Sequence, residues 1–270
     1  MRFLQPRAIG ELLAAAAEIF GSDYTFSAKI TYSDEPESYA ECTQARRGGD
    51  IYMHNTQVYP DSLDYDITSL YLDGTIYEAD NNIGAYRIFG ESEEVNADEM
   101  SVVLLVANYG LERTSTHIPA DTEGMTVEEY TYTGDTYMTI YDFYFDESGA
   151  LKKYTTVYSV EGEDDIIQTT EVISLEAQAD ESLFDLSIFD GMKAFDELTE
   201  DERLGFCQET CGKFSVTTDM MNEMSITTDD FKTIDLAEFS TLIQTYGEKP
   251  KADEDSKTDK KDASKEQKEN

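Results

Sequence analysis

Apolar and polar residues alternate most regularly along residues 24–32, which read YTFSAKITY. One face carries Tyr24, Phe26, Ala28, Ile30 and Tyr32, and the Thr, Ser and Lys residues between them lie on the opposite face. Strict alternation of this kind predicts a strand with one buried and one polar face.

Turn residues divide the region that follows into paired strands. The sequence RRGGD at 46–50 separates residues 38–45 from residues 51–55 and predicts a hairpin. Asp73-Gly74 separates residues 67–72 from residues 75–79, and this dipeptide favours a type I′ turn. Residues 83–89 form a further short predicted strand.

Four long β-type runs follow, over residues 125–132, 136–145, 150–160 and 165–175. Short turns connect consecutive runs, so the pattern predicts an antiparallel meander. Residues 136–145 are apolar on both faces, with Tyr141 and Phe143 on one and Ile140 and Tyr144 on the other. We expect this strand to be covered on both sides or to face a cavity.

Helical periodicity predicts three amphipathic helices. Residues 8–20 stop at Gly21, and their apolar side carries Ile9, Leu12, Leu13, Ala16 and Phe20. Residues 198–211 have a capping box made by Thr199 and Glu202. Residues 236–246 carry an apolar stripe that ends at Gly247.

A fourth helix is predicted over residues 98–109, with Asn96 and Glu99 as its capping box. Its sequence VVLLVA is apolar nearly all round, so we expect both sides of the helix to be covered. Two roles fit this pattern: a static core helix, or a movable lid over a cavity.

The formal net charge of −38 excludes some classes of partner. Residues 247–270 hold 7 Lys and 8 acidic residues, so nearly all of the charge lies before them. A surface this negative repels phosphate backbones, and we expect no nucleic acid partner. No run of eighteen apolar residues occurs, and no transmembrane span is predicted.

Few residues offer catalytic or metal chemistry. The chain has two histidines, His54 and His117, and three cysteines, Cys42, Cys207 and Cys211. Cys207 and Cys211 share a face of a predicted helix, but no second Cys pair or nearby His completes a zinc site, so buried thiols are expected. The motifs GxSxG and HExxH are absent. We predict no enzyme activity, no metal and no cofactor. A glycosidase needs two carboxylates that face each other across a cleft, and the spacing of acidic residues along the sequence does not test for such a pair.

Four segments together give the chain a resemblance to a known family. They are the opening helix that leads into YTFSAKITY, the hairpin SLYLDGTIYEAD, the run FYFDESGALKKYTTV, and the acid-flanked segment DESLFDLS at 180–187. Over residues 8–190 the chain resembles the outer-membrane lipoprotein carrier (LolA-like) superfamily and its LppX-like lipoprotein relatives. Members often have Pro where this chain has Ser187.

The resemblance implies an α+β fold: a strongly curved, half-open antiparallel β-barrel-like sheet with helices plugging its concave side. Phe184 and Leu186 would tuck the chain under the last strand and seal apolar contents from water. The function implied is non-enzymatic binding of a lipid, acyl chain or lipoprotein at the cell envelope or cell surface, with any signal peptide or lipid anchor absent from this chain. We expect the ligand contacts to be Tyr24, Phe26, Ile30, Tyr32, Val103, Leu104, Ala107, Tyr141 and Phe143.

Three parts are expected along the chain: a curved-sheet domain over 1–190, a mainly helical extension over 191–247, and a disordered charged tail over 248–270. We expect a monomer. The alternative function is a structural or regulatory module of the same fold, with its concavity filled by its own side chains, that binds a protein through its acidic surface.

Overall fold

The computed structural model describes residues 9–91, 101–109, 111, 113–118 and 124–250. Twelve strands within these ranges form one sheet. The strands are β1 (Tyr24–Tyr32), β2 (Tyr39–Arg47), β3 (Asp50–Val58), β4 (Tyr65–Leu72), β5 (Thr75–Asp80), β6 (Ala85–Glu91), β7 (Arg113–His117), β8 (Thr126–Thr133), β9 (Tyr137–Phe145), β10 (Leu151–Val160), β11 (Ile166–Glu176) and β12 (Lys193–Ala194).

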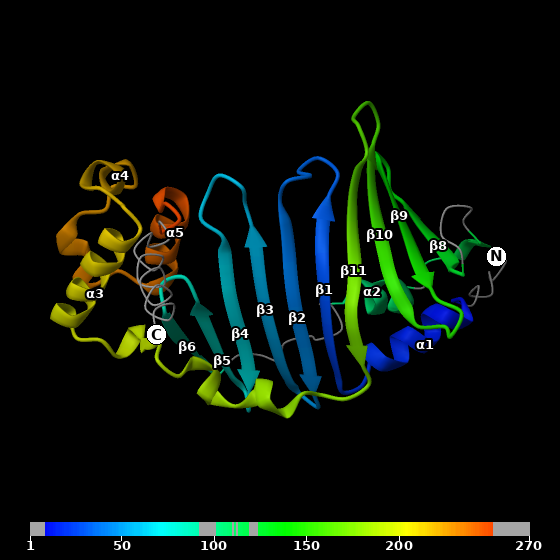
Figure 1. Cartoon of the computed structure of the whole chain (residues 1–270), viewed down its shortest axis with the longest axis horizontal. Helices are drawn as coiled ribbons and strands as arrows, with labels where there is room; N and C mark the ends of the chain where they lie inside the picture. The colour runs from blue at the N-terminus through cyan, green and yellow to red at the C-terminus, as the bar shows by residue number, and fades with distance from the viewer. Residues whose placement is uncertain (1–8, 92–100, 110, 112, 119–123, 251–270) are drawn as a thin grey trace, which may run out of the picture.

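The sheet has the order β12-β6-β5-β4-β3-β2-β1-β11-β10-β9-β8-β7. Its neighbouring strands pair antiparallel, except that the short β12 runs parallel to β6. Figure 1 shows these strands side by side in a curved sheet, whose edges β12 and β7 do not meet. The predicted α+β class with a strongly curved, half-open sheet is therefore confirmed, and the sheet is not a closed barrel.

Local turn chemistry places the hairpins where the sequence predicts them. Asp73 and Gly74 join β4 to β5 with φ of 50° and 83°. Positive φ at both central residues is what a type I′ turn requires, and this turn matches the twist of the strands it joins. The meander β8–β11 also follows the four predicted runs.

Helices α1 (Glu11–Phe20) and α2 (Val102–Asn108) pack on one face of the sheet, here called the inner face. Figure 1 shows both helices at the end of the sheet formed by β8–β11. Their side chains join those of the strands in a buried cluster that includes Leu13, Phe20, Phe26, Val103, Phe143 and Phe145. This cluster is the core of that half of the molecule.

A buried carboxylate fixes the start of α1, which begins at Glu11 and not at residue 8. Glu128 on β8 is 2% exposed and accepts hydrogen bonds from the Leu13 N–H at 3.1 Å and from the Tyr130 hydroxyl at 3.0 Å. The Tyr130 hydroxyl accepts from the Gly10 N–H at 2.8 Å. A negative charge is favourable at a helix N-terminus, where backbone N–H groups lack partners.

The start of α2 differs from the predicted one. Asn96 and Glu99 lie outside the described residues, and the N-cap is Ser101, whose hydroxyl accepts from the Leu104 N–H. Serine is among the preferred N-cap residues because its oxygen satisfies a free N–H of the first turn. Val103, Leu104 and Val106 are buried, in agreement with the apolar pattern.

The segment 180–190 covers the opposite, outer face of the sheet, and the prediction that it seals the inner face is wrong. It forms two short 3-10 helices, η2 (Glu181–Phe184) and η3 (Leu186–Phe189). Phe184 and Phe189 pack with a row of β2–β5 side chains, namely Ala45, Tyr52, Leu70 and Ala79. Leu186, expected to be buried with Phe184, is 44% exposed.

Acidic caps explain which side chains of this segment turn toward the sheet. Asp180 and Asp185 accept hydrogen bonds from the backbone N–H two residues later, and each caps one short helix. The two capping carboxylates face water, and the last residue of each short helix, Phe184 or Phe189, points to the sheet. The Phe189 ring stacks on Tyr86 at 5.1 Å and on Tyr77 at 5.9 Å between centroids.

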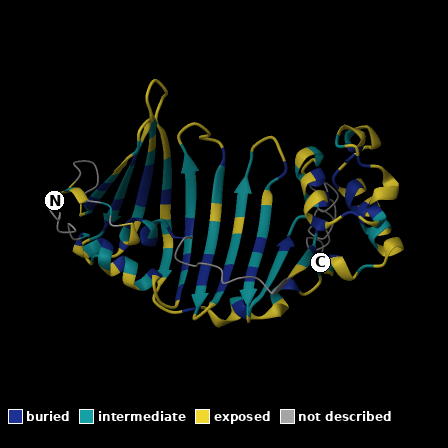
Figure 2. Cartoon of the chain, turned by 180° about the vertical axis from the view of Figure 1, so that it is seen from behind, coloured by how far each residue is buried: buried dark blue, intermediate teal, exposed yellow. Residues whose placement is uncertain are grey.

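A helical unit lies at the β6 end of the sheet, as Figure 1 shows. It contains α3 (Glu200–Lys213), α4 (Thr218–Glu223), α5 (Leu236–Tyr246) and the 3-10 helices η4 (Phe195–Glu197) and η5 (Thr228–Lys232). The predicted capping box of Thr199 and Glu202 is present at α3. Figure 2 shows buried positions inside this unit as well as along the strands. Three residues from the sheet side join its apolar cluster: Leu63 from the β3–β4 connection, Ile83 from the β5–β6 turn, and Ala85 of β6.

Candidate functional site

A pocket of about 330 Å³ lies on the inner face beneath α2. Its floor comes from β1–β3, with Phe26, Ile30, Gln44 and Met53, and α2 covers it with Val102 and Val103. Tyr154 of β10 forms part of its wall. Most of these side chains are apolar, which is the usual lining of a small-molecule pocket.

Gln44 is one of the polar residues that line this pocket, together with Thr43, Asn55, Ser101 and Gln168. Its side chain is buried, since the residue is 8% exposed, and its Nε2 atom has no hydrogen-bond partner among the described residues. A buried donor without a partner costs about 1–3 kcal/mol. An oxygen atom of a bound ligand would remove this cost.

Tyrosines extend the inner face from the pocket toward the hairpin tips. Strand register places five of them there, here called the tyrosine wall: Tyr32, Tyr132, Tyr137, Tyr141 and Tyr158. Three are exposed by 43–46%, and the rings of Tyr132 and Tyr137 lie 5.7 Å apart. A tyrosine ring offers apolar area with a polar tip, which suits an amphipathic ligand.

The phenols of the wall influence one another. Burial raises the pKa of Tyr32 and of Tyr141, and in both residues the nearby Tyr158 adds to the rise. A hydrogen bond with Tyr132 raises the pKa of Tyr137. The raised pKa values of Tyr32, Tyr137 and Tyr141 keep these three phenols protonated at neutral pH, so they can contact an apolar chain as uncharged groups.

The wall and the pocket form one surface. Tyr154 of the pocket and Tyr158 of the wall lie on the same face of β10, and Ile30 and Tyr32 do so on β1. Two exposed aliphatic residues, Val160 and Ile166, complete the inner face near the tips. An exposed apolar and aromatic surface of this kind commonly marks a binding site.

The structure places the nine residues expected from the sequence in four different surroundings. Phe26, Ile30 and Val103 line the pocket, and Tyr32 and Tyr141 belong to the tyrosine wall. Tyr24, Leu104 and Phe143 lie in the packed cluster beneath α1 and α2. Ala107 is half-buried on α2. Their role as ligand contacts stays a prediction.

Several lining residues escaped the sequence analysis. Gln44 and Met53 come from strands in which apolar and polar residues alternate poorly. The sequence pattern therefore does not indicate the face of the sheet on which these two residues lie. Tyr132, Tyr137 and Tyr158 carry a usable signal, since each continues the period-two pattern of its strand. Only the register across strands brings these residues to the same face.

The cysteines are not part of this site's chemistry, except that Cys42 lines the pocket. All three thiols are free, and Cys207 and Cys211 are buried as predicted. Burial raises the pKa of Cys207 to about 12 and that of Cys211 to about 11, so both remain protonated and unreactive at neutral pH. Within the described residues, no cluster of His, Cys, Asp and Glu could hold a metal ion.

One polar group on the outer face contains a histidine. His54 Nε2 lies 2.8 Å from Asp66 Oδ1, which also accepts from Asn81 Nδ2 at 2.7 Å. The Thr56 hydroxyl lies 3.4 Å from the same nitrogen of His54. A nucleophile relay needs the acid and the hydroxyl on different ring nitrogens, so this arrangement is not a Thr-His-Asp triad.

The comparisons with known proteins find similarity among solved structures and not among sequences. No family model and no curated protein sequence matches the chain. Among solved structures, a LolA superfamily protein from Nitrosomonas europaea is similar over 66% of this chain and 97% of its own, at 9% sequence identity and a TM-score of 0.32. These values are too low to support an argument about function. No helix among the described residues has the length and apolar character needed to cross a membrane.

Proposed function

We propose that this protein is a non-enzymatic binder of an apolar ligand that lies along the inner face of the sheet. The ligand is a lipid, an acyl chain or a lipoprotein, and it contacts both the pocket beneath α2 and the tyrosine wall. The observation that carries this proposal is the continuity of a pocket of about 330 Å³ with an exposed aromatic surface. The Gln44 amide, for which the described residues offer no partner, would donate to an ester or carboxyl oxygen of the ligand.

The proposal includes the family and the location that the sequence suggests. Residues 1–190 would be a LolA-like curved-sheet domain, residues 191–247 a helical extension, and residues 248–270 a charged tail, of which 251–270 lie outside the described residues. Most members of one apolar cluster come from residues 195–243, which supports this division, and Leu63, Ile83 and Ala85 join that cluster from the first part. The protein would act as a monomer in the cell envelope or at the cell surface, with no nucleic acid partner and no cofactor.

Lipid extraction tests the proposal directly. The purified protein is extracted with organic solvent, and the extract is examined by mass spectrometry. A co-purifying lipid or acyl compound is expected. An empty extract from protein that also fails to bind an apolar fluorescent probe such as 1-N-phenylnaphthylamine would overturn the proposal and favour the alternative, a protein-binding module with a self-filled inner face.

Two adjacent isoleucines provide a matched pair of variants. Ile166 and Ile167 on β11 are 40% and 39% exposed but lie on opposite faces, because Ile166 is paired with Tyr158 of the wall and Ile167 with Val157. We expect Ile166→Asp to weaken binding of the probe about tenfold, since the charge must lose water beside the ligand. Ile167→Asp should leave binding within about twofold. Equal effects of the two variants would contradict an inner-face site.

A further inference from the structure

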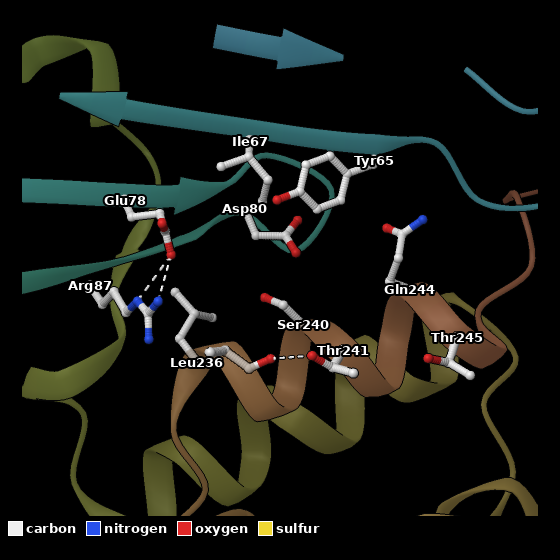
Figure 3. Close-up of a pocket in the computed structure, with 11 residues that line it drawn as sticks. Tyr65, Ile67, Glu78, Asp80, Arg87, Leu236, Ser240, Thr241, Gln244 and Thr245 are labelled. Atoms are coloured by element: carbon white, nitrogen blue, oxygen red, sulfur yellow. Dashed lines mark hydrogen bonds and ion pairs between the residues drawn. The ribbon is translucent and has the colours of Figure 1, made fainter. Parts of the chain in front are cut away.

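A second pocket, of about 350 Å³, lies on the same inner face between α5 and the strands β4–β6. Figure 3 shows Tyr65, Ile67, Glu78 and Asp80 facing the hydroxyl and amide side chains of α5 across this pocket. The sequence assigns no role to α5. The structure makes it one wall of a binding-sized cavity.

The charges in this pocket do not cancel. Arg87 donates from Nε and Nη2 to Glu78 Oε1 at 3.1 Å and 2.7 Å, so these two side chains neutralise each other. Asp80 has no cationic partner among the described residues. It is 6% exposed, and its Oδ1 accepts from the N–H groups of Asn82 and Ile83 at 3.0 Å and 3.1 Å. One negative charge therefore remains in the wall of the pocket.

A buried carboxylate without a counter-ion is unfavourable, and a cationic ligand would relieve it. Burial raises the pKa of Asp80, although backbone N–H groups and the Ser240 hydroxyl hydrogen-bond to its carboxyl. The Tyr65 ring stands beside this carboxyl in Figure 3. An aromatic face next to a carboxylate is a common site for ammonium groups. The net charge of −38 also raises the local concentration of cations.

Two cross-strand rows connect this pocket with the one beneath α2. One row pairs Gln44 with Met53, Met53 with Ser69 and Ser69 with Glu78. The next row pairs Asn55, which lines the pocket beneath α2, with Ile67, which lines the pocket beneath α5. At about 4.8 Å between strands, Gln44 and Glu78 are roughly 14 Å apart. A single-chain amphiphile can span this distance.

We propose that the pocket beneath α5 binds the ammonium head group of a cationic amphiphile whose chain runs along the inner face to the pocket beneath α2. This inference rests on the proposed function and names its class of ligand. Asp80 and the Tyr65 ring contact the ammonium group, and α5 closes the head-group end. The helical unit at the β6 edge then selects the ligand by its charge.

Two probes with the same chain test the inference by calorimetry: dodecyltrimethylammonium and the neutral dodecyl maltoside, both below their micelle concentrations. Titrations are made at 150 mM salt, about where the Debye length is 8 Å, to screen the general surface charge. The wild-type protein should bind the ammonium compound about tenfold more tightly than the maltoside. Asp80→Asn should abolish this preference and leave maltoside binding within about twofold.

Asp142→Asn is the matched control, because Asp142 is also a sheet carboxyl whose pKa is raised by burial, but it lies on β9 away from both pockets. It removes the same charge and should keep the preference. The inference is overturned, while the proposed function stands, if the wild-type protein binds dodecyl maltoside as tightly as dodecyltrimethylammonium. The same holds if Asp80→Asn and Asp142→Asn weaken the preference for the ammonium compound equally. If neither probe binds, both are overturned.

Discussion

Alternate residues of strands β2–β5 form the two faces of the sheet, and the two faces are covered very differently. On the outer face, Ala45, Leu70 and Ala79 are fully buried beneath Phe184 and Phe189. On the inner face, Met53 is half-buried, Asn55 is exposed, and the Gln44 amide has no partner among the described residues. Segment 180–190 completes the outer core, whereas the part of the chain that the structure describes leaves pockets on the inner face.

This difference shows that the outer face stabilises the fold and that the inner face has space for a ligand. A closed apolar cluster gains free energy from every side chain it buries. An open, partly polar surface does not, and it contributes little to folding until something covers it. Substitutions on the outer face should therefore change stability most, and those on the inner face should change binding most.

The largest effect is expected at Phe184, which is 4% exposed on the outer face. Phe184→Ala should lower the free energy of unfolding by about 3–5 kcal/mol, because it removes a buried ring and leaves a cavity. Leu186→Ala, two residues away and 44% exposed, is the control and should cost less than about 1 kcal/mol. Urea unfolding measures both. Similar losses in the two variants would contradict the observed packing of this segment.

A smaller loss is expected at the anchor of α1. Gly10→Ala places a methyl group against the Glu128 carboxyl, which is fixed by the α1 backbone and by Tyr130. We expect a loss of about 1–3 kcal/mol, the usual range for overpacking a buried site. Gly205→Ala in α3 has open space around its Cβ and serves as the control. A Gly10→Ala protein as stable as the wild type would show that the start of α1 adapts freely.

Asp80 on the inner face should change stability with pH. Because burial raises its pKa above the ordinary value of 3.8, the folded state binds this proton more tightly than the unfolded state does. The protonated Asp80 carboxyl adds to the free energy of unfolding below pH 3.8, and this stabilisation is lost as the pH rises through the pKa of the folded state. Asp80→Asn should thus be more stable than the wild type at pH 7, and the gap should narrow as the pH falls toward 4.

Asp146 in the β9–β10 turn gives the opposite sign. Hydrogen bonds from Ser148 and from the Ala150 N–H lower its pKa to about 2. Its contribution is present above pH 3.8 and is lost as the pH falls to about 2. Asp146→Asn should therefore be less stable than the wild type at neutral pH. Urea titrations at several pH values check both signs, and two variants with parallel profiles would contradict the assignment.

The smallest effect is expected at Gln44. Gln44→Leu removes a buried amide nitrogen that finds no partner in the described part of the chain, so the stability of the ligand-free protein should stay within about 1 kcal/mol of the wild type or rise slightly. Thermal unfolding after delipidation measures this. A marked loss of stability would mean that the amide is satisfied inside the folded protein, and the inner face would then be closed like the outer one.

The sequence by itself determined the local elements of this protein. Alternation and turn residues such as Asp73-Gly74 specify the hairpins, and Thr199 with Glu202 specifies the start of α3, because these signals act between residues close in the chain. Phe26, Ile30, Val103, Tyr32 and Tyr141 could be expected near a cavity because each lies on an apolar face. The cover of each face could not be predicted, since the packing of Phe184 and Phe189 on β2–β5 and the docking of α5 depend on partners far away in the sequence. Only strand register, a tertiary property, placed Gln44, Ile67 and Asp80 on one surface between two helices.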